Sequence, residues 1–72
     1  MKLLTIAVTN MKPQTYWVVC RPTEDNPLND IQYYTLRPTR KDSIYKFTDV
    51  KYYWQDVRKD GWRCVKVNLT AI

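Results

Sequence analysis

Hydrophobic and polar residues alternate in short runs along the chain, and this pattern predicts β-strands. The first nine residues read MKLLTIAVT, and every second position from Leu4 to Val8 is apolar, so these side chains share one face of an extended chain. Residues 15–21 (TYWVVCR) are rich in the β-branched and aromatic residues that strands favour. Because residues 10–14 interrupt the pattern between these two runs, we expect the two strands to pair as a hairpin.

The same two-residue period predicts two further strands. Residues 31–37 (IQYYTLR) follow a loop, residues 23–30 (TEDNPLND), that is crowded with turn-forming residues. The last run, residues 62–72 (WRCVKVNLTAI), alternates between an apolar and a polar face. Pro22 and Pro38 stand just after the second and third predicted strands, where a residue without a backbone N–H ends the pairing.

The period changes to a helical one in the stretch TDVKYYWQDVRKDG, which begins at Thr48. Its apolar and aromatic residues recur at intervals of three and four and form one stripe of a helix: Val50, Tyr53, Trp54 and Val57. Gly61 suits the left-handed position that follows a helix. The pattern predicts a helix over about residues 48–60 and leaves residues 44–47 as a short strand or a loop.

These elements follow the order β-β-β-(β)-α-β, which predicts an α+β fold. We expect a small, mostly antiparallel sheet of three to five strands with one amphipathic helix packed on one face. Because 72 residues are too few for two domains, we expect residues 1–72 to form a single domain. Because one helix covers only one face, we expect the other face to be solvated, self-paired or covered by a partner.

Charge is distributed unevenly along the chain. Residues 1–36 hold three basic and three acidic side chains, whereas residues 37–72 hold nine basic and four acidic ones, so the second half carries the whole net charge of +5. A basic half favours an anionic partner, although any small soluble protein needs net charge to avoid self-association. We expect the contact residues to be its basic and aromatic side chains: Arg37, Arg40, Lys41, Tyr45, Lys46, Lys51, Tyr52 and Arg58.

The composition argues against most catalytic chemistry. The chain has no histidine, so the usual proton shuttle is missing, and its only serine, Ser43, has no evident base nearby. Two cysteines without a histidine do not complete a tetrahedral zinc site, and one glycine does not build a phosphate-binding loop. We therefore expect no enzyme, metal site or cofactor. A metal-independent ribonuclease that uses arginine, lysine and tyrosine is the one catalytic alternative left open.

The N-terminal residues lack the pattern of a signal peptide, and no run is apolar and long enough to span a bilayer. We therefore expect a cytoplasmic protein without a membrane partner. In that compartment Cys20 and Cys64 are expected to be reduced thiols.

Together these observations predict a small binding protein. We expect it to dock, as a monomer or homodimer, onto an anionic protein or nucleoprotein complex, as a stoichiometric accessory or inhibitory protein. The alternative is direct binding of single-stranded nucleic acid. In that alternative, an open sheet face would carry Trp17 or Tyr16, Tyr33 or Tyr34, and Lys66 as a stacking platform. The competing explanation for these aromatic residues is structural, because rings on strands pack against side chains of neighbouring strands.

Overall fold

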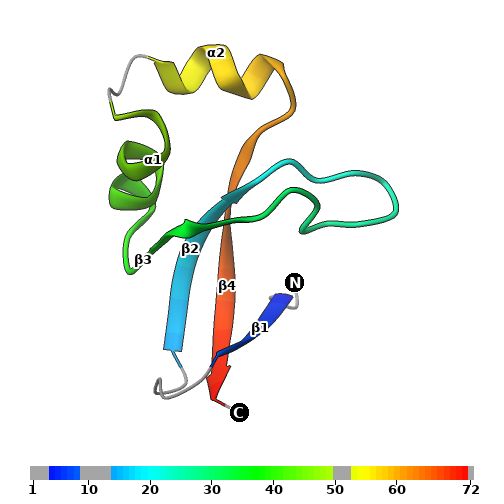
Figure 1. The fold of residues 1–72 in the computed structure, drawn as a ribbon, viewed down its shortest axis with the longest axis vertical. Helices are drawn as coiled ribbons and strands as arrows, with labels where there is room; N and C mark the ends of the chain where they lie inside the picture. The colour runs from blue at the N-terminus through cyan, green and yellow to red at the C-terminus, as the bar shows by residue number, and fades with distance from the viewer. Residues whose placement is uncertain (1–3, 9–13, 50–52, 72) are drawn as a thin grey trace.

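A computed structural model describes residues 4–8, 14–49 and 53–71. Within these residues, four strands and two helices follow one another in the order shown in Figure 1. Their bounds are β1 Leu4–Val8, β2 Gln14–Cys20, β3 Gln32–Arg37, α1 Arg40–Thr48, α2 Tyr53–Lys59 and β4 Arg63–Ala71. The α+β class and the mostly antiparallel sheet expected from the sequence are confirmed.

The sheet is built around β4, and its strand order is β1-β4-β2-β3. β2 runs antiparallel to β4, with Gln14 opposite Leu69 at one end and Cys20 opposite Arg63 at the other. β1 runs parallel to β4 on the other side, starting with Leu4 opposite Val67. The expected hairpin between the first two strands is therefore wrong, because β4 lies between them. The nine residues of β4 are enough to pair with both neighbours.

The pairing of β2 with β3 contains a bulge. Trp17 is opposite Arg37 and Val19 is opposite Gln32, so β3 uses five steps where β2 uses two. The fully buried Thr35 lies in this bulge. Its hydroxyl oxygen accepts a hydrogen bond from the Val19 N–H (2.8 Å) and donates one to the Gln32 carbonyl (2.6 Å). These two hydrogen bonds replace backbone hydrogen bonds that the bulge removes between β2 and β3. They also hold in place the part of β3 that leads into α1.

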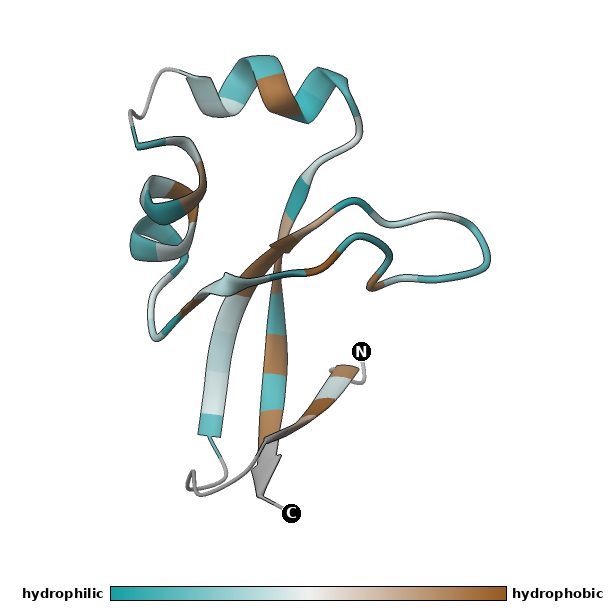
Figure 2. Ribbon diagram, viewed as in Figure 1, coloured by the Kyte–Doolittle hydropathy of each residue, from teal (hydrophilic) through white to brown (hydrophobic). Residues whose placement is uncertain are grey.

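Apolar side chains cover both faces of the sheet. Adjacent residues of a strand point to opposite faces, and the adjacent Val18 and Val19 belong to two different buried clusters. On the Val18 face, the cluster is completed by residues of β1 and β4, with residues of β3 and of the loop before it packed against them: Ile6, Val67 and Leu69, and Leu28, Ile31 and Leu36. The sheet face away from the helices is thus covered by side chains of the chain's own loop and of β3. In Figure 2, brown and teal alternate along β4 as its residues turn inward and outward.

On the Val19 face, the cluster is completed by the two helices. Ile44 of α1 and Trp54 of α2 are its other buried members, and Phe47, Val57, Trp62 and Cys64 pack against them. The rings of Phe47 and Trp62 lie 4.9 Å apart between centroids. Figure 1 shows both helices at one end of the long β2 and β4 strands. No helix among the described residues is long and apolar enough to cross a membrane.

The expectation of one helix over residues 48–60 is wrong in its bounds. α1 takes in residues 44–47, which were expected to be a short strand or loop, and a second helix, α2, covers Tyr53–Lys59. α1 starts because Thr39 caps it: the Thr39 hydroxyl accepts a hydrogen bond from the Asp42 N–H at 3.2 Å. It ends at Asp49, which has a left-handed φ of 61°.

The end of the second helix agrees with the sequence. Gly61 follows α2 with φ 99°, and its N–H donates to the Arg58 carbonyl. A side chain at this position would be strained and would also approach the Arg21 side chain, at 3.3 Å. Val50, from the predicted helical stripe, lies outside the described residues. The other three members lie on α2, and among them Trp54 is buried, Val57 is half-buried and Tyr53 is exposed.

Candidate functional site

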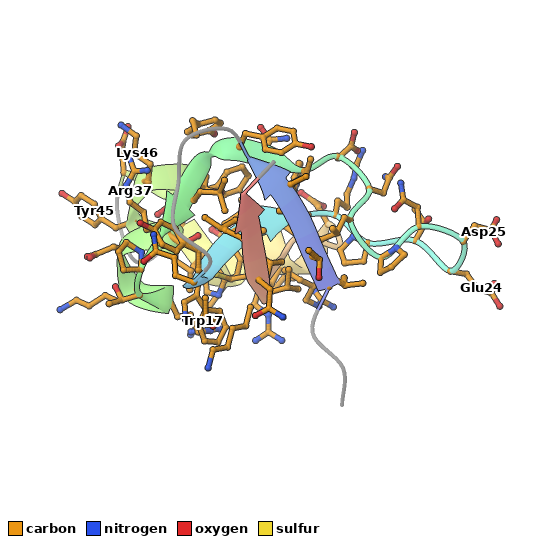
Figure 3. All side chains as sticks on the ribbon, turned by 90° about the horizontal axis from the view of Figure 1, so that it is seen from below. Trp17, Glu24, Asp25, Arg37, Tyr45 and Lys46 are labelled. Carbon is orange, nitrogen blue, oxygen red and sulfur yellow. The ribbon has the colours of Figure 1, made fainter. Side chains whose placement is uncertain are left out.

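Five of the eight predicted contact residues come together on or beside α1. Arg37 ends β3, Arg40 and Lys41 open α1, and Tyr45 and Lys46 follow within the same helix. We term these five residues the α1 surface. Figure 3 shows Arg37, Tyr45 and Lys46 together at one end of the molecule, with Glu24 and Asp25 at the far end. The basic surface and the acidic loop therefore occupy opposite ends.

The sequence around α1 accounts for this exposure. Pro38 and Thr39 separate β3 from α1, and the helix then turns Ser43 and Ile44 inward, where both are buried. Side chains on the other side of the helix must face solvent because residues one turn apart share a face. Lys41 and Lys46 are exposed, and the Tyr45 side chain is 52% exposed.

Two hollows flank this helix. The first, of about 310 Å³, is lined by three members of the α1 surface and two carboxylates: Arg37, Tyr45, Lys46, Asp42 and Asp49. The carboxylates would repel a bare phosphate in this hollow. The second, of about 460 Å³, is lined by Arg40, Lys41, Ile44 and Trp54. It combines apolar walls with two cations, and none of its described lining residues is acidic.

None of the cations of the α1 surface forms an ion pair within the described part of the chain. There the one ion pair joins Arg21 to Asp30 at 2.8 Å, where the loop between β2 and β3 begins and ends. Arg21 also lies over the Trp62 ring, with its guanidinium carbon 5.2 Å from the ring centroid. Arg40 and Lys41 have no such partner among residues 4–8, 14–49 and 53–71. Their charges are available to an external anion.

The position of Arg40 and Lys41 is unfavourable for the helix itself. The N-terminus of a helix carries a partial positive charge, so a cation in the first turn costs about 0.3–1 kcal/mol. Asp42 in the same turn offsets part of that cost. α1 therefore carries two cations that neither a described ion pair nor the helix dipole explains. Departures of this kind from local rules concentrate at functional sites.

Two polar atoms are buried beneath the helices without a hydrogen-bond partner among the described residues. They are Trp54 Nε1 and Ser43 Oγ. An unpaired buried donor or acceptor costs about 1–3 kcal/mol. Ser43 Oγ makes no geometrically acceptable hydrogen bond, but it lies near enough to the Cys64 sulfur to favour its thiolate. No described residue offers Ser43 a base, so its geometry does not make it a nucleophile.

Both cysteines are free thiols. Burial, with a smaller contribution from Cys64, raises the pKa of Cys20 to about 11. Burial also raises the pKa of Cys64, while Ser43 and the charge of Arg40 oppose that rise. The Cys64 thiol lies beneath the start of α1 and its sulfur is 4.0 Å from the Arg40 carbonyl oxygen. Raised pKa values keep both thiols protonated at neutral pH, which disfavours nucleophilic chemistry.

The other predicted contact residues do not join the α1 surface. Arg58 lies in the last turn of α2, and Figure 1 shows that end of α2 pointing away from α1. Lys51 and Tyr52 lie outside the described residues. Within the described ranges, no group of three or more histidine, cysteine, aspartate or glutamate residues is arranged to hold a metal ion.

The stacking platform considered for nucleic acid is only partly assembled. Trp17 is half-buried and lies opposite both Lys66 and Arg37 in the sheet register, so the ring has cations beside it. Tyr16 belongs to the other face, where it packs against the Val18 cluster. Tyr33 and Tyr34 are exposed, but they lie in the bulged part of β3. These rings therefore do not form one continuous face.

Sequence reasoning missed Ile44 as a member of the site. The signal was present: a threonine followed three residues later by an acidic residue, as in Thr39 and Asp42, indicates a helix start. A helix from residue 40 places Ile44 one turn after Arg40. No family model matches the chain, and comparisons with curated proteins and with solved structures found no match.

Proposed function

We propose that this chain is a non-catalytic docking protein whose α1 surface binds an acidic site on a larger protein or nucleoprotein complex. It would act by stoichiometric binding, as an accessory or inhibitory protein. The single observation that carries the proposal is the pair of first-turn cations, Arg40 and Lys41, which have no acidic partner among the described residues and oppose the helix dipole.

The chemistry of the surface suits a protein partner. Arginine and tyrosine are enriched at interfaces, and complementary charge speeds association and fixes its orientation. Arg37, Arg40 and Tyr45 supply these residue types around one helix. The apolar hollow beside Arg40 and Lys41 adds a place for a partner side chain.

Direct nucleic-acid binding receives less support from this geometry. Base stacking requires exposed ring faces next to phosphate-binding cations. On the α1 surface Tyr45 is the single aromatic residue, and its hollow also contains Asp42 and Asp49. Carboxylates beside the ring weaken a phosphate site and are tolerated at the rim of a protein interface.

The test is a quantitative capture experiment with charge-reversed variants. Tagged wild-type protein is incubated with lysate of its native cells, with and without nuclease, and bound proteins are measured by mass spectrometry. Arg40→Glu/Lys41→Glu is compared with the matched control Arg58→Glu/Lys59→Glu, which makes the same charge change on α2. We expect one partner at a stoichiometric level, reduced at least about tenfold by the α1 variant alone, because like charges would then face each other.

Three outcomes would contradict this function. Equal loss of the partner in both variants would show that only net charge matters. Loss of the partner after nuclease treatment, together with direct binding of a single-stranded oligonucleotide that weakens steeply with salt, would make nucleic acid the ligand. Defined cleavage of RNA that disappears in Tyr45→Phe would make the protein an enzyme.

A further inference from the structure

The hollow between α1 and α2 has the features of an anchor site. The described residues that line it are Ile44 and Trp54, which are apolar, and Arg40 and Lys41, which are cationic. We propose that this hollow receives one bulky apolar side chain from an acidic peptide segment of the partner. The inference rests on the proposed function and specifies which chemistry the partner presents.

The apolar part of the occupant follows from the walls. Ile44 and Trp54 are each 8% exposed and belong to the buried cluster that includes Val19. An apolar side chain placed against them would extend this core and remove further apolar surface from water. Interfaces derive much of their affinity from a few anchors that fill such hollows.

The acidic part of the occupant follows from the cations. Arg40 and Lys41 are exposed and have no ion pair with any described residue. The nearest acidic residue of the same helix turn, Asp42, lines the other hollow instead. Carboxylates on either side of the anchor would therefore meet two unneutralised cations.

A nucleobase is a poorer occupant of the same hollow. Stacking needs an open ring face, and Trp54, the one described aromatic residue of the lining, is 8% exposed. Trp54 Nε1 is also an unused donor within the described structure. Carbonyl acceptors occur in peptides and in bases alike, so this donor does not distinguish the two occupants.

A second copy of the chain is the other acidic candidate. Its loop presents Glu24 and Asp25 at the end opposite the α1 surface (Figure 3). However, Leu28 of that loop is half-buried against the protein's own core, so it is not free to act as an anchor. The net charge of +5 also opposes association between copies. A partner segment therefore fits better than self-association.

The probe is a labelled synthetic peptide of about twelve residues, with one central phenylalanine flanked by glutamates, and its counterpart with alanine at the centre. Binding to the full chain is measured by fluorescence anisotropy. We expect the phenylalanine peptide to bind at least about tenfold more tightly than the alanine peptide, because the anchor is buried. Arg40→Ala/Lys41→Ala should weaken binding of the phenylalanine peptide about tenfold, whereas Arg58→Ala/Lys59→Ala should not change it.

The possible failures separate this inference from the proposed function. Equal affinity for the two peptides, or no binding of either, would overturn the anchor site. The docking function would survive that result if lysate capture still depended on Arg40 and Lys41. Self-association measured by sedimentation, lost on Glu24→Lys/Asp25→Lys, would assign the hollow to a second copy and would also overturn the peptide proposal.

Discussion

The two helices differ in how their charges relate to their own dipoles. α2 has Asp56 in its first turn and Arg58 and Lys59 in its last, which is the arrangement that stabilises a helix. α1 starts with two cations, Arg40 and Lys41, ahead of its first carboxylate. The charges of α2 are explained by the stability of the helix. The two first-turn cations of α1 are not, which is why the proposed contact is placed on α1.

The helices also differ in how firmly the sheet holds them. α1 packs against β2, β3 and β4, whereas α2 contacts the strands much less extensively. Trp54 is the buried residue of α2 among the described positions, while α1 buries Ser43 and Ile44. The proposed docking surface thus lies on the helix that packs more extensively against the sheet. Precise sites need rigid elements, so this difference agrees with the proposed role of α1.

The largest expected effect on stability comes from replacing Trp54, the buried side chain of α2. Trp54→Ala should lower the free energy of unfolding by about 3–5 kcal/mol, because it deletes a large buried side chain and leaves a cavity. The free energy of unfolding of a domain of this size exceeds this loss by only a few kcal/mol. Urea denaturation followed by circular dichroism measures the loss.

Hydrogen exchange then tests the difference in support between the helices. In a milder variant, Trp54→Phe, amides of α2 should lose protection before those of α1, because α2 depends on this one buried residue. Val57→Ala, at a half-buried position of the same helix, serves as the comparison. An equal loss of protection in both helices would mean that they open as one unit, and the contrast between them would fail.

A medium effect is expected when the charges are reversed. Arg40→Glu/Lys41→Glu should raise the free energy of unfolding by about 1 kcal/mol, since it replaces two first-turn cations with anions. Arg58→Glu/Lys59→Glu should lower it by a similar amount, because it places anions at the negative end of α2. Urea denaturation of both variants at low salt measures the two changes.

The same α1 variant is the one expected to lose its partner. A gain in stability combined with a loss of binding is typical of residues kept for function. If Arg40→Glu/Lys41→Glu lowered stability instead, these cations would have a structural role and the main argument for docking would be lost. High salt should shrink both stability changes, because the dipole interaction is screened.

The positions of the strands could be predicted from the sequence, but which strands pair with each other could not. Alternation in residues 31–37 and 62–72 located β3 and β4 to within a residue or two. Pairing depends on contacts between distant segments, so alternation did not reveal that β4 inserts between β1 and β2. The bulge at Thr35 could not be predicted either, because it depends on a hydrogen bond that the Val19 N–H donates to the Thr35 hydroxyl.

The residue types of the candidate site could be predicted from the sequence, but their positions in the fold could be predicted only in part. The basic residues after Pro38 were identified, and the structure places three of them on α1 with Tyr45, while Arg37 lies beside them at the end of β3: Arg40, Lys41 and Lys46. Arg58 was included because the helix predicted over about residues 48–60 contains it, and the structure places it in the last turn of α2, apart from the α1 surface. α1 was missed because its apolar pattern is weak. Its start depends on the cap at Thr39, not on periodicity.

The smallest expected effect is on the reactivity of Cys64, which lies beneath the first turn of α1. Arg40 lowers the pKa of Cys64 against the larger effect of burial, so Arg40→Glu should raise that pKa further and slow alkylation by iodoacetamide a few-fold at pH 8. Below its pKa, the thiolate fraction and hence the rate should rise about tenfold per pH unit in both proteins.

Cys20 and Lys59 supply the controls. Cys20 is fully buried with a pKa of about 11, so it should react more slowly than Cys64 at every pH below that value. Lys59→Glu, at the end of α2, should leave the rate at Cys64 unchanged. If it slowed Cys64 as much as Arg40→Glu did, the thiol would sense only the net charge of the molecule. The two helices would then be electrostatically equivalent at this position, which their contrasting charge patterns do not predict.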